Sequence, residues 1–413
     1  MRFAIHTLGT RGDMQPYLAL ARGLRGRGHE VLVVAPVQFA AMAQAEGIGS
    51  AALPGAFLDL LDSQEAKDAI GKSGAGFGAG FKLLKHYRAL MGELLDAEWA
   101  AASEFRPDAI LYHPKALGAP HIAARLGAAR LLASPLPGFT PTAAFPTPIL
   151  PFANLGPLNR PSHALMIHGG NALFSSTVGA WRETTLGLPR KGTLPLLTGT
   201  LYAYSQHVLP RPDDWGTDVD VTGYWFLDSL DWKPDAELAA FLAAGDAPVY
   251  VGFGSMPGVA PEQLTAMVVE GLRQAGKRGL IATAGGALQR LEGLADMHFI
   301  AGAPHDRLFP LMQATLHHGG AGTTGAALRA GKPTAIVPFI GDQPFWARRV
   351  TELGVGPSAL DKRKMTVDDL AGAFRAMEAP TMRQRAAELG AAIRSERGVE
   401  DAMDFIERRM MGR

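Results

Sequence analysis

The sequence predicts an α/β protein made of two Rossmann-like halves. Short apolar strands alternate with helical segments from the start of the chain, with a strand at residues 3–8 and a helix at residues 17–27. A second series of the same kind starts with a strand at residues 248–253. The chain has 413 residues, which is long for one core and suits two domains of roughly 200 residues each.

Breaks in this alternation give the expected domain boundaries. An N-terminal domain at residues 1–210 is followed by a linker at residues 211–235, where Pro, Asp, Gly and Trp lack helical or strand periodicity. The C-terminal domain is expected at residues 236–382. Residues 383–413 are rich in Arg and Glu, and they predict a helical tail with a solvated amphipathic face.

Composition narrows the possible functions. Charged residues make up 19% of the chain and the formal net charge is +1, so there is no electrostatic reason to expect a nucleic-acid partner. The absence of cysteine excludes disulfides, thiolate metal ligands and a cysteine nucleophile. We find neither a signal peptide ahead of the first strand nor an unbroken run of about 18 apolar residues, so the expected compartment is the cytoplasm.

A glycine-rich loop between a strand and a helix is the first candidate binding site. Residues 317–324 have the sequence His-His-Gly-Gly-Ala-Gly-Thr-Thr. Glycine lets the backbone approach a ligand closely, and the free N–H groups at a helix start attract anions. The loop therefore suits a diphosphate, and a plain strand-to-helix turn is the alternative. A second polar cluster, Gly341-Asp342-Gln343, follows the next apolar strand and favours the binding role.

Asp13, in the N-terminal half, is the candidate catalytic residue. It lies in the loop after the first strand, and ligands of such sheets bind beyond the carboxyl ends of the strands. An ionised carboxylate there can accept the proton of a hydroxyl as a general base. The equally weighted alternative is that Asp13 caps the helix beginning near Pro16. His6, inside the first strand, is expected to be a buried structural residue.

Two stretches of the N-terminal half predict a pocket for a large apolar acceptor. Residues 71–81 contain five glycines with Phe77 and Phe81, which suits a mobile lid or a plain flexible loop; a peripheral membrane contact of this lid stays open. In residues 131–181, which include Phe139 and Phe145, the only formally charged residue is Arg160. The prolines of that stretch exclude a membrane helix but allow a wall of loops around an apolar cavity. Internal packing is the alternative.

These features together indicate a nucleotide-sugar donor opposite a hydroxylic small-molecule acceptor. A carboxylate and an apolar pocket lie on one side of the expected cleft. On the other side are the diphosphate loop, the turn at Gly254-Ser255 and the Asp-Gln pair. The alternatives from other classes are a nucleotide-sugar epimerase and a nucleotide-sugar binding protein that has lost catalysis.

Five motifs resemble those of family 1 glycosyltransferases of the GT-B fold, in particular sterol 3-beta-glucosyltransferases and antibiotic aglycone glucosyltransferases. They are GTRGDMQPYLAL (9–20), VTGYWFLD (221–228), PHD (304–306), HHGGAGTTGA (317–326) and GDQPFWA (341–347). The resemblance implies two Rossmann-like domains that face each other across a cleft. It also implies an inverting, metal-independent transfer of a hexose, expected to be glucose, from a UDP-sugar to a sterol, terpenoid or polyketide-like hydroxyl, without a cofactor.

The resemblance also implies roles for individual residues. Asp13 stands where related plant enzymes carry a catalytic histidine, and this favours the general-base interpretation. The residues implied in donor binding are Ser255, His305, His317, Gly320, Gly322, Thr323, Asp342 and Gln343. The chain departs from its relatives at Gly302-Ala303, where many carry an aromatic residue for the base, and at Gly325, where plant enzymes carry a glutamate for the ribose. A dTDP-sugar is therefore the alternative donor.

Overall fold

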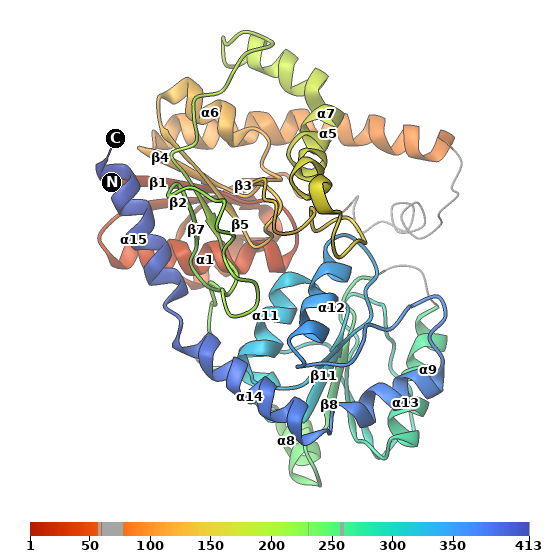
Figure 1. Ribbon diagram of the computed structural model, residues 1–413. Coiled ribbons are helices and arrows are strands. Elements are labelled where there is room, and N and C mark those ends of the chain that lie inside the picture. The colour runs from red at the N-terminus through yellow and green to blue at the C-terminus, as the bar shows by residue number, and fades with distance from the viewer. Residues whose placement is uncertain (57–58, 60–76, 230, 257–259, 413) are drawn as a thin grey trace.

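Two parallel sheets, each with its own core, form the two halves of the molecule (Figure 1). The structure is a computed structural model that describes residues 1–56, 59, 77–229, 231–256 and 260–412, with only the backbone for residues 77–89 and 170. The first sheet has seven strands in the order β3-β2-β1-β4-β5-β6-β7, and the second has five in the order β10-β9-β8-β11-β12. All neighbouring strands run parallel. The predicted α/β class with two Rossmann-like domains is confirmed.

The N-terminal sheet is buried on both faces by helices, as expected for continuous apolar strands. Its strands are β1 (Arg2–His6), β2 (Glu30–Pro36), β3 (Gly49–Leu53), β4 (Ala109–Tyr112), β5 (Ala129–Ser134), β6 (Gly199–Tyr202) and β7 (Val219–Val221). Its helices are α1 (Arg11–Gly26), η1 (Val37–Phe39), α2 (Ala40–Ala45), α5 (Phe77–Phe105), α6 (Ala119–Leu126), η2 (Gly156–Leu158) and α7 (Asn159–Thr184). Strand β7 lies within residues 211–235, so the expected linker contains the last strand of this sheet.

The C-terminal sheet repeats the alternation in a smaller unit. Its strands are β8 (Val249–Gly252), β9 (Gly279–Ala282), β10 (Met297–Ile300), β11 (Ala314–His317) and β12 (Thr334–Ile336). Helices α8 (Ala236–Ala243), α9 (Pro261–Gln274), α10 (His305–Leu308), η3 (Phe309–Leu311), α11 (Ala321–Arg329), α12 (Gln343–Glu352) and α13 (Val367–Ala376) accompany them. Because β8 and β11 are neighbours at the centre, the loops after these strands open toward the same edge.

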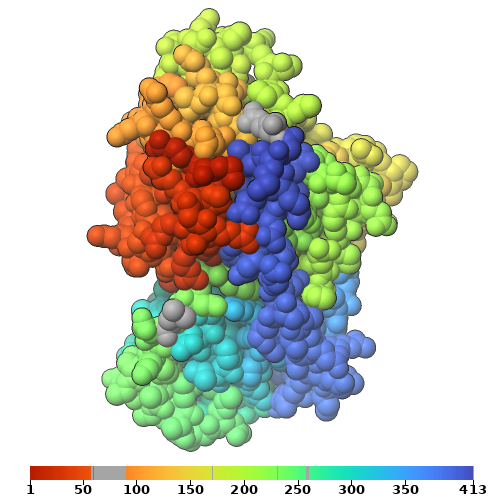
Figure 2. Space-filling view, turned by 90° about the vertical axis from the view of Figure 1, so that its left-hand side faces the viewer, coloured from red at the N-terminus to blue at the C-terminus, as the bar shows by residue number. Residues whose placement is uncertain are grey.

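The C-terminal helices join the two halves. Helix α14 (Pro380–Ser395) packs on α11, and α15 (Gly398–Met411) returns to pack on α1 of the N-terminal half. Figure 2 shows this segment, in blue, running from the lower half up against the red N-terminal part. Ala402, Phe405 and Ile406 are buried in the first core, because their spacing places them on one face of the helix. The expected helical tail is therefore present and amphipathic, since Glu400, Asp401 and Arg408 are exposed while this apolar face is buried.

Candidate functional site

The predicted base loop and the predicted diphosphate loop meet where the two sheets face each other. Helices α1 and α11 start at their respective sheet edges and lie next to each other across the boundary of the halves (Figure 1). A Cβ atom built on Gly322, in the first turn of α11, would lie 3.9 Å from the Cα of Gly12 in α1. The structure therefore brings together two motifs that are about 300 residues apart in sequence.

Asp13 is the third residue of α1, and Thr10 is the N-cap. The Thr10 backbone N–H donates to Asp13 Oδ2 at 2.9 Å, which completes a capping box. A Cβ at Gly9, whose φ is +141°, would overlap the Asp13 carboxylate, so glycine is required for this arrangement. Asp13 thus takes part in capping, but the helix begins at Arg11 and not near Pro16. Proline is common at a helix start, and this preference misplaced the predicted boundary.

Two residues that the sequence did not single out complete the surroundings of Asp13. His113 Nε2 lies 3.2 Å from Asp13 Oδ1, and Lys115 Nζ donates to Oδ2 at 2.9 Å. His113 Nδ1 accepts the backbone N–H of Lys115 at 3.0 Å, so the ring proton is on Nε2 and is donated to Asp13. Only its position in the sequence could have indicated His113, because it directly follows β4, the neighbour of β1. The backbone N–H of His113 donates to the His6 carbonyl at 2.8 Å.

This setting keeps Asp13 ionised. Burial by itself would raise the pKa of the carboxyl, but the Lys115 ammonium and the His113 hydrogen bond hold that pKa well below its usual value. Burial lowers the pKa of His113, so its imidazole is neutral at pH 7. The His113 side chain is 6% exposed with both nitrogens engaged, whereas Asp13 is 17% exposed. Asp13 is therefore the group of this pair that an incoming hydroxyl can reach.

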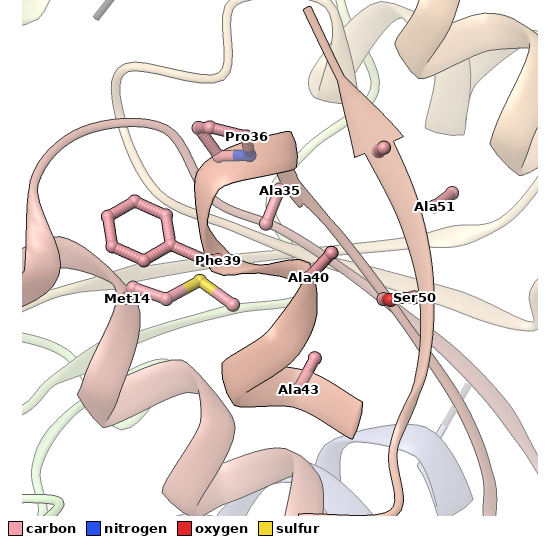
Figure 3. A pocket seen from close by; sticks show the side chains of 9 residues that line it. Met14, Ala35, Pro36, Phe39, Ala40, Ala43, Ser50 and Ala51 are labelled. Atoms are coloured by element: carbon pink, nitrogen blue, oxygen red, sulfur yellow. The ribbon is translucent and has the colours of Figure 1, made fainter. Parts of the chain in front are cut away.

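The residues packed next to the Asp13 turn leave little free space. Met14 is buried beside Phe39 and Ala35, next to a cavity of about 10 Å³ (Figure 3). A space of this size is near the minimum for one water molecule, so it is not an acceptor cavity. As predicted, His6 is fully buried, and its Nδ1 lies 2.9 Å from Glu98 Oε2. Its Nε2, however, has no hydrogen-bond partner among the described residues, so the ring is only partly satisfied.

The glycine-rich loop presents several backbone N–H groups at the start of α11 that make no intrahelical hydrogen bond. The first intrahelical hydrogen bond runs from Thr324 N–H to the carbonyl of the N-cap, Gly320, so the N–H groups of residues 321–323 precede it. His317 is fully buried at the end of β11, and its Nδ1 accepts the Gly319 N–H at 3.0 Å. Its proton is therefore on Nε2, which has no hydrogen-bond partner among the described residues. Such a set fits an anionic group with several oxygen atoms.

Two further histidines, His318 in this loop and His305 near it, are neutral. The His305 ring stacks on Phe309 with centroids 4.3 Å apart, and burial, assisted by the nearby Arg11 charge, lowers its pKa to about 4. Burial likewise lowers the pKa of His318 to about 4, and its Nδ1 is unpaired within the described part of the chain. His317 follows the same trend, since burial brings its pKa well below the usual value. The rings can therefore donate hydrogen bonds without carrying charge at neutral pH.

The side chains of Asp342 and Gln343 differ in the hydrogen bonds that they already make. Asp342 Oδ2 accepts the Trp346 indole N–H at 2.7 Å, burial raises its pKa, and the charges of Lys115 and Asp13 reach it across the boundary. Gln343 Oε1 accepts the N–H groups of residues 339 and 340 at 2.7 and 3.0 Å, and its Nε2 lies 3.3 Å from a methionine sulfur. The Gln343 oxygen thus supports its own loop, and a sugar contact through its amide stays a prediction.

Ser255 lies in the turn that follows β8, at the same sheet edge. Gly254 in this turn has φ of +60°, and Gly285 packs so closely that a Cβ there would overlap the Gly254-Ser255 peptide. The turn at Gly254-Ser255 therefore packs against the turn at Gly285-Gly286, beside the loop of residues 317–324. The role of Ser255 in donor binding stays a prediction.

The four predicted acceptor residues lie in different parts of the N-terminal domain. Phe145 is 8% exposed, with its ring 5.9 Å from those of His163 and Phe345, so it contributes to the contact between the halves. Phe139 packs on the core beneath α6 and α7. Phe77 and Phe81 are in the first turns of α5, not in a loop, and their side chains, like residues 71–76, lie outside the described residues. In the part of the chain that is described, no helix is long and apolar enough to cross a membrane.

Comparisons with known proteins agree with this arrangement. The sequence model described as glycosyltransferase family 28 N-terminal domain matches residues 3–145, and that described as erythromycin biosynthesis protein CIII-like, C-terminal domain, matches residues 285–401. Sterol 3-beta-glucosyltransferase UGT80B1 of Arabidopsis thaliana is 33% identical over 425 residues, which cover 99% of this chain and 68% of that protein. The chain spans as little as 27% of a sterol 3-beta-glucosyltransferase of Neurospora crassa, which is 34% identical.

Solved structures confirm the fold. The glycotransferase of kitacinnamycin superposes with a TM-score of 0.73 at 21% identity, covering 99% of both chains. The glycosyltransferase VinC in complex with DTDP superposes with a TM-score of 0.67 at 16% identity, covering 100% of both. Sequence similarity over nearly the whole chain and the paired sheets lead to the same conclusion: the chain belongs to the family of GT-B glycosyltransferases that includes the sterol 3-beta-glucosyltransferases.

Proposed function

We propose that this chain transfers a hexose from a nucleoside diphosphate sugar to a hydroxyl group of an apolar acceptor, with inversion and without a metal ion. The observation that carries the proposal is the close approach of the turn that holds Asp13 to the start of α11. UDP-glucose is the first donor to test. Sterols, terpenoids and polyketide-like aglycones are the first acceptors.

In the proposed reaction, the acceptor hydroxyl donates a hydrogen bond to Asp13 and loses its proton to that carboxylate. The hydroxyl oxygen forms a bond to the anomeric carbon while the bond from this carbon to the diphosphate oxygen breaks. The leaving diphosphate takes the electron pair, and its negative charge is stabilised by the N–H groups of residues 321–323 and by His317 Nε2–H. A single displacement of this kind inverts the anomeric configuration.

His113 has a supporting role in this proposal. Its Nε2–H donates to one oxygen of Asp13 and fixes the orientation of the carboxylate. Asp13 loses its charge when it receives the proton. Because the His113 ring is neutral, no unpaired charge is then left on the buried ring. His113 is thus a positioning residue and Asp13 the catalytic one.

Two observations guide the choice of substrates. The 33% identity to sterol 3-beta-glucosyltransferase UGT80B1 supports glucose as the sugar and an apolar hydroxylated acceptor. The structurally similar VinC was solved with DTDP, and Gly302-Ala303 provides no aromatic ring for a base, so dTDP-glucose is the alternative donor.

The proposal is tested by incubating the protein with UDP-glucose or dTDP-glucose, with and without a panel of sterols and aglycones. Mass spectrometry should detect a glycoside and an equal amount of released nucleoside diphosphate in the presence of a suitable acceptor only. A change of the sugar without an acceptor would indicate an epimerase. Nucleotide binding without any product would indicate a binding protein that has lost catalysis.

A further inference from the structure

Lys115 differs from the other groups that donate to Asp13. The Thr10 N–H is part of the backbone, and the Thr10 hydroxyl lies 3.4 Å from Oδ2, too far for a strong hydrogen bond. The His113 ring is buried and held by a second hydrogen bond. The Lys115 side chain is 52% exposed and is long and flexible, and its Nζ lies 2.9 Å from Asp13 Oδ2. It is thus the donor that can leave the carboxylate at the lowest cost in free energy.

Of the two Asp13 oxygens, Oδ2 accepts from both the Thr10 N–H and Lys115, whereas Oδ1 accepts from His113. A carboxylate oxygen has two lone pairs, so Oδ2 has no place for an acceptor hydroxyl while Lys115 is bound to it. An acceptor hydroxyl must donate to one of these oxygens before it can transfer its proton. A further donor at Oδ2 has to come from the exposed side, which is the side of the Lys115 ammonium.

We propose that Lys115 is an exchangeable partner of Asp13, whose ammonium occupies the place that the acceptor hydroxyl takes during transfer. The inference rests on the proposed function, since it assumes that Asp13 receives the hydroxyl proton. Lys115 is a positioning residue in this scheme. It keeps the carboxylate ionised and in place between turnovers, and it moves away when the acceptor arrives.

The surroundings of Asp13 allow this exchange. The other titratable groups that face it are His113, Tyr17 on its own helix and Asp342 from the opposite half. The Tyr17 hydroxyl is committed to the Ala133 carbonyl at 2.5 Å, so it does not compete for the carboxylate. The charge of Lys115 also reaches Asp342, the carboxylate of the opposite half. Once the ammonium has moved, the carboxylate is a stronger base for the hydroxyl that replaced it.

The test uses Lys115→Met and Lys115→Arg in the full chain, with the best acceptor of the panel at saturating donor. Removing an exposed ion pair that competes with the acceptor should lower the acceptor KM about 1.4- to 5-fold without lowering kcat. Lys115→Arg, which keeps the charge, should restore the KM toward the wild-type value. Hydrolysis of UDP-glucose by water, with no acceptor, should also rise in Lys115→Met. Lys191→Met, at an exposed lysine after α7, is the control for the gain in apolar surface.

An unchanged or higher acceptor KM in Lys115→Met would overturn the inference, as would a loss of activity that Lys115→Arg does not restore. The proposed function fails separately, because Asp13→Asn would then transfer the sugar at the wild-type rate. If Asp13→Asn is inactive while Lys115→Met has wild-type KM, only the role of Lys115 is wrong. Thermal unfolding of each variant shows that the fold is intact.

Discussion

Two capping boxes of the same kind are present in the described part of the chain, and they allow the capping role of Asp13 to be separated from its proposed catalytic role. Asp13 in α1 and Asp369 in α13 are both the third residue of a helix whose N-cap is threonine. In each box the threonine backbone N–H donates to the aspartate Oδ2 at 2.9 Å. Asp369 lies outside the candidate site, so Asp369→Asn is a matched control for Asp13→Asn.

Both variants weaken one capping box, so both should unfold at a slightly lower temperature. Only Asp13→Asn removes the carboxylate that faces His113 and Lys115. General-base catalysis typically contributes a factor of about 10² to 10⁴. The rate of transfer should therefore fall by that factor, which corresponds to about 3–5 kcal/mol on the activation barrier.

The assay is single-turnover transfer from UDP-glucose to the best acceptor, with nucleotide affinity measured by calorimetry. Asp13→Asn should bind UDP with wild-type affinity, because the proposed diphosphate loop belongs to the other half. Asp369→Asn should keep both affinity and rate. A wild-type rate for Asp13→Asn would refute the assignment of the base. An equal loss in both variants would show that capping, and not base catalysis, explains the effect.

Three further predictions concern the loops and the pH dependence of stability. His317→Ala should weaken UDP binding about 10- to 150-fold, the cost of a buried hydrogen bond to a charged group, and unchanged affinity by calorimetry would contradict the assigned diphosphate site. Gly9→Ala should lower both transfer and stability, because its Cβ would overlap the base carboxylate, whereas Gly28→Ala, with φ of +83° and open space around it, should lower stability alone in unfolding and activity assays. Burial lowers the pKa of His305 and of His318 to about 4, below the 6.5 of an unperturbed imidazole, so the unfolded chain takes up protons first on acidification. The free energy of unfolding in urea should therefore fall between about pH 6.5 and pH 4, and a flat profile over this range would contradict the buried neutral rings.

Much of the site could be predicted because its residues follow strands that the hydrophobic pattern identifies. Asp13 comes after β1, His317 ends β11, and Asp342 follows β12, so the rule that ligands bind beyond strand ends predicts that all three lie where the two sheets face each other. His113 and Lys115 could not be assigned in the same way. Their contact with Asp13 depends on β4 pairing with β1, a register that links residues about 100 positions apart.

Two other features have local physical causes that the sequence pattern does not show. The Arg and Glu residues of the tail predict its solvated face, but they do not reveal that the opposite face, with Ala402, Phe405 and Ile406, is buried against α1. Gln343 was assigned to the donor sugar from its motif alone. A motif does not reveal that backbone N–H groups of residues 339 and 340 need an acceptor, which the Gln343 oxygen provides.

The central claim is that the carboxylate and the diphosphate loop carry out one inverting transfer between a nucleotide sugar and an apolar hydroxyl. The most direct measurement is the anomeric configuration, by NMR, of the glycoside formed from UDP-α-glucose and the best acceptor. We predict a β-glucoside, formed in equal amount to the UDP released and absent with Asp13→Asn. An α-glucoside, or the absence of any glycoside across the panel with both donors, would contradict the account.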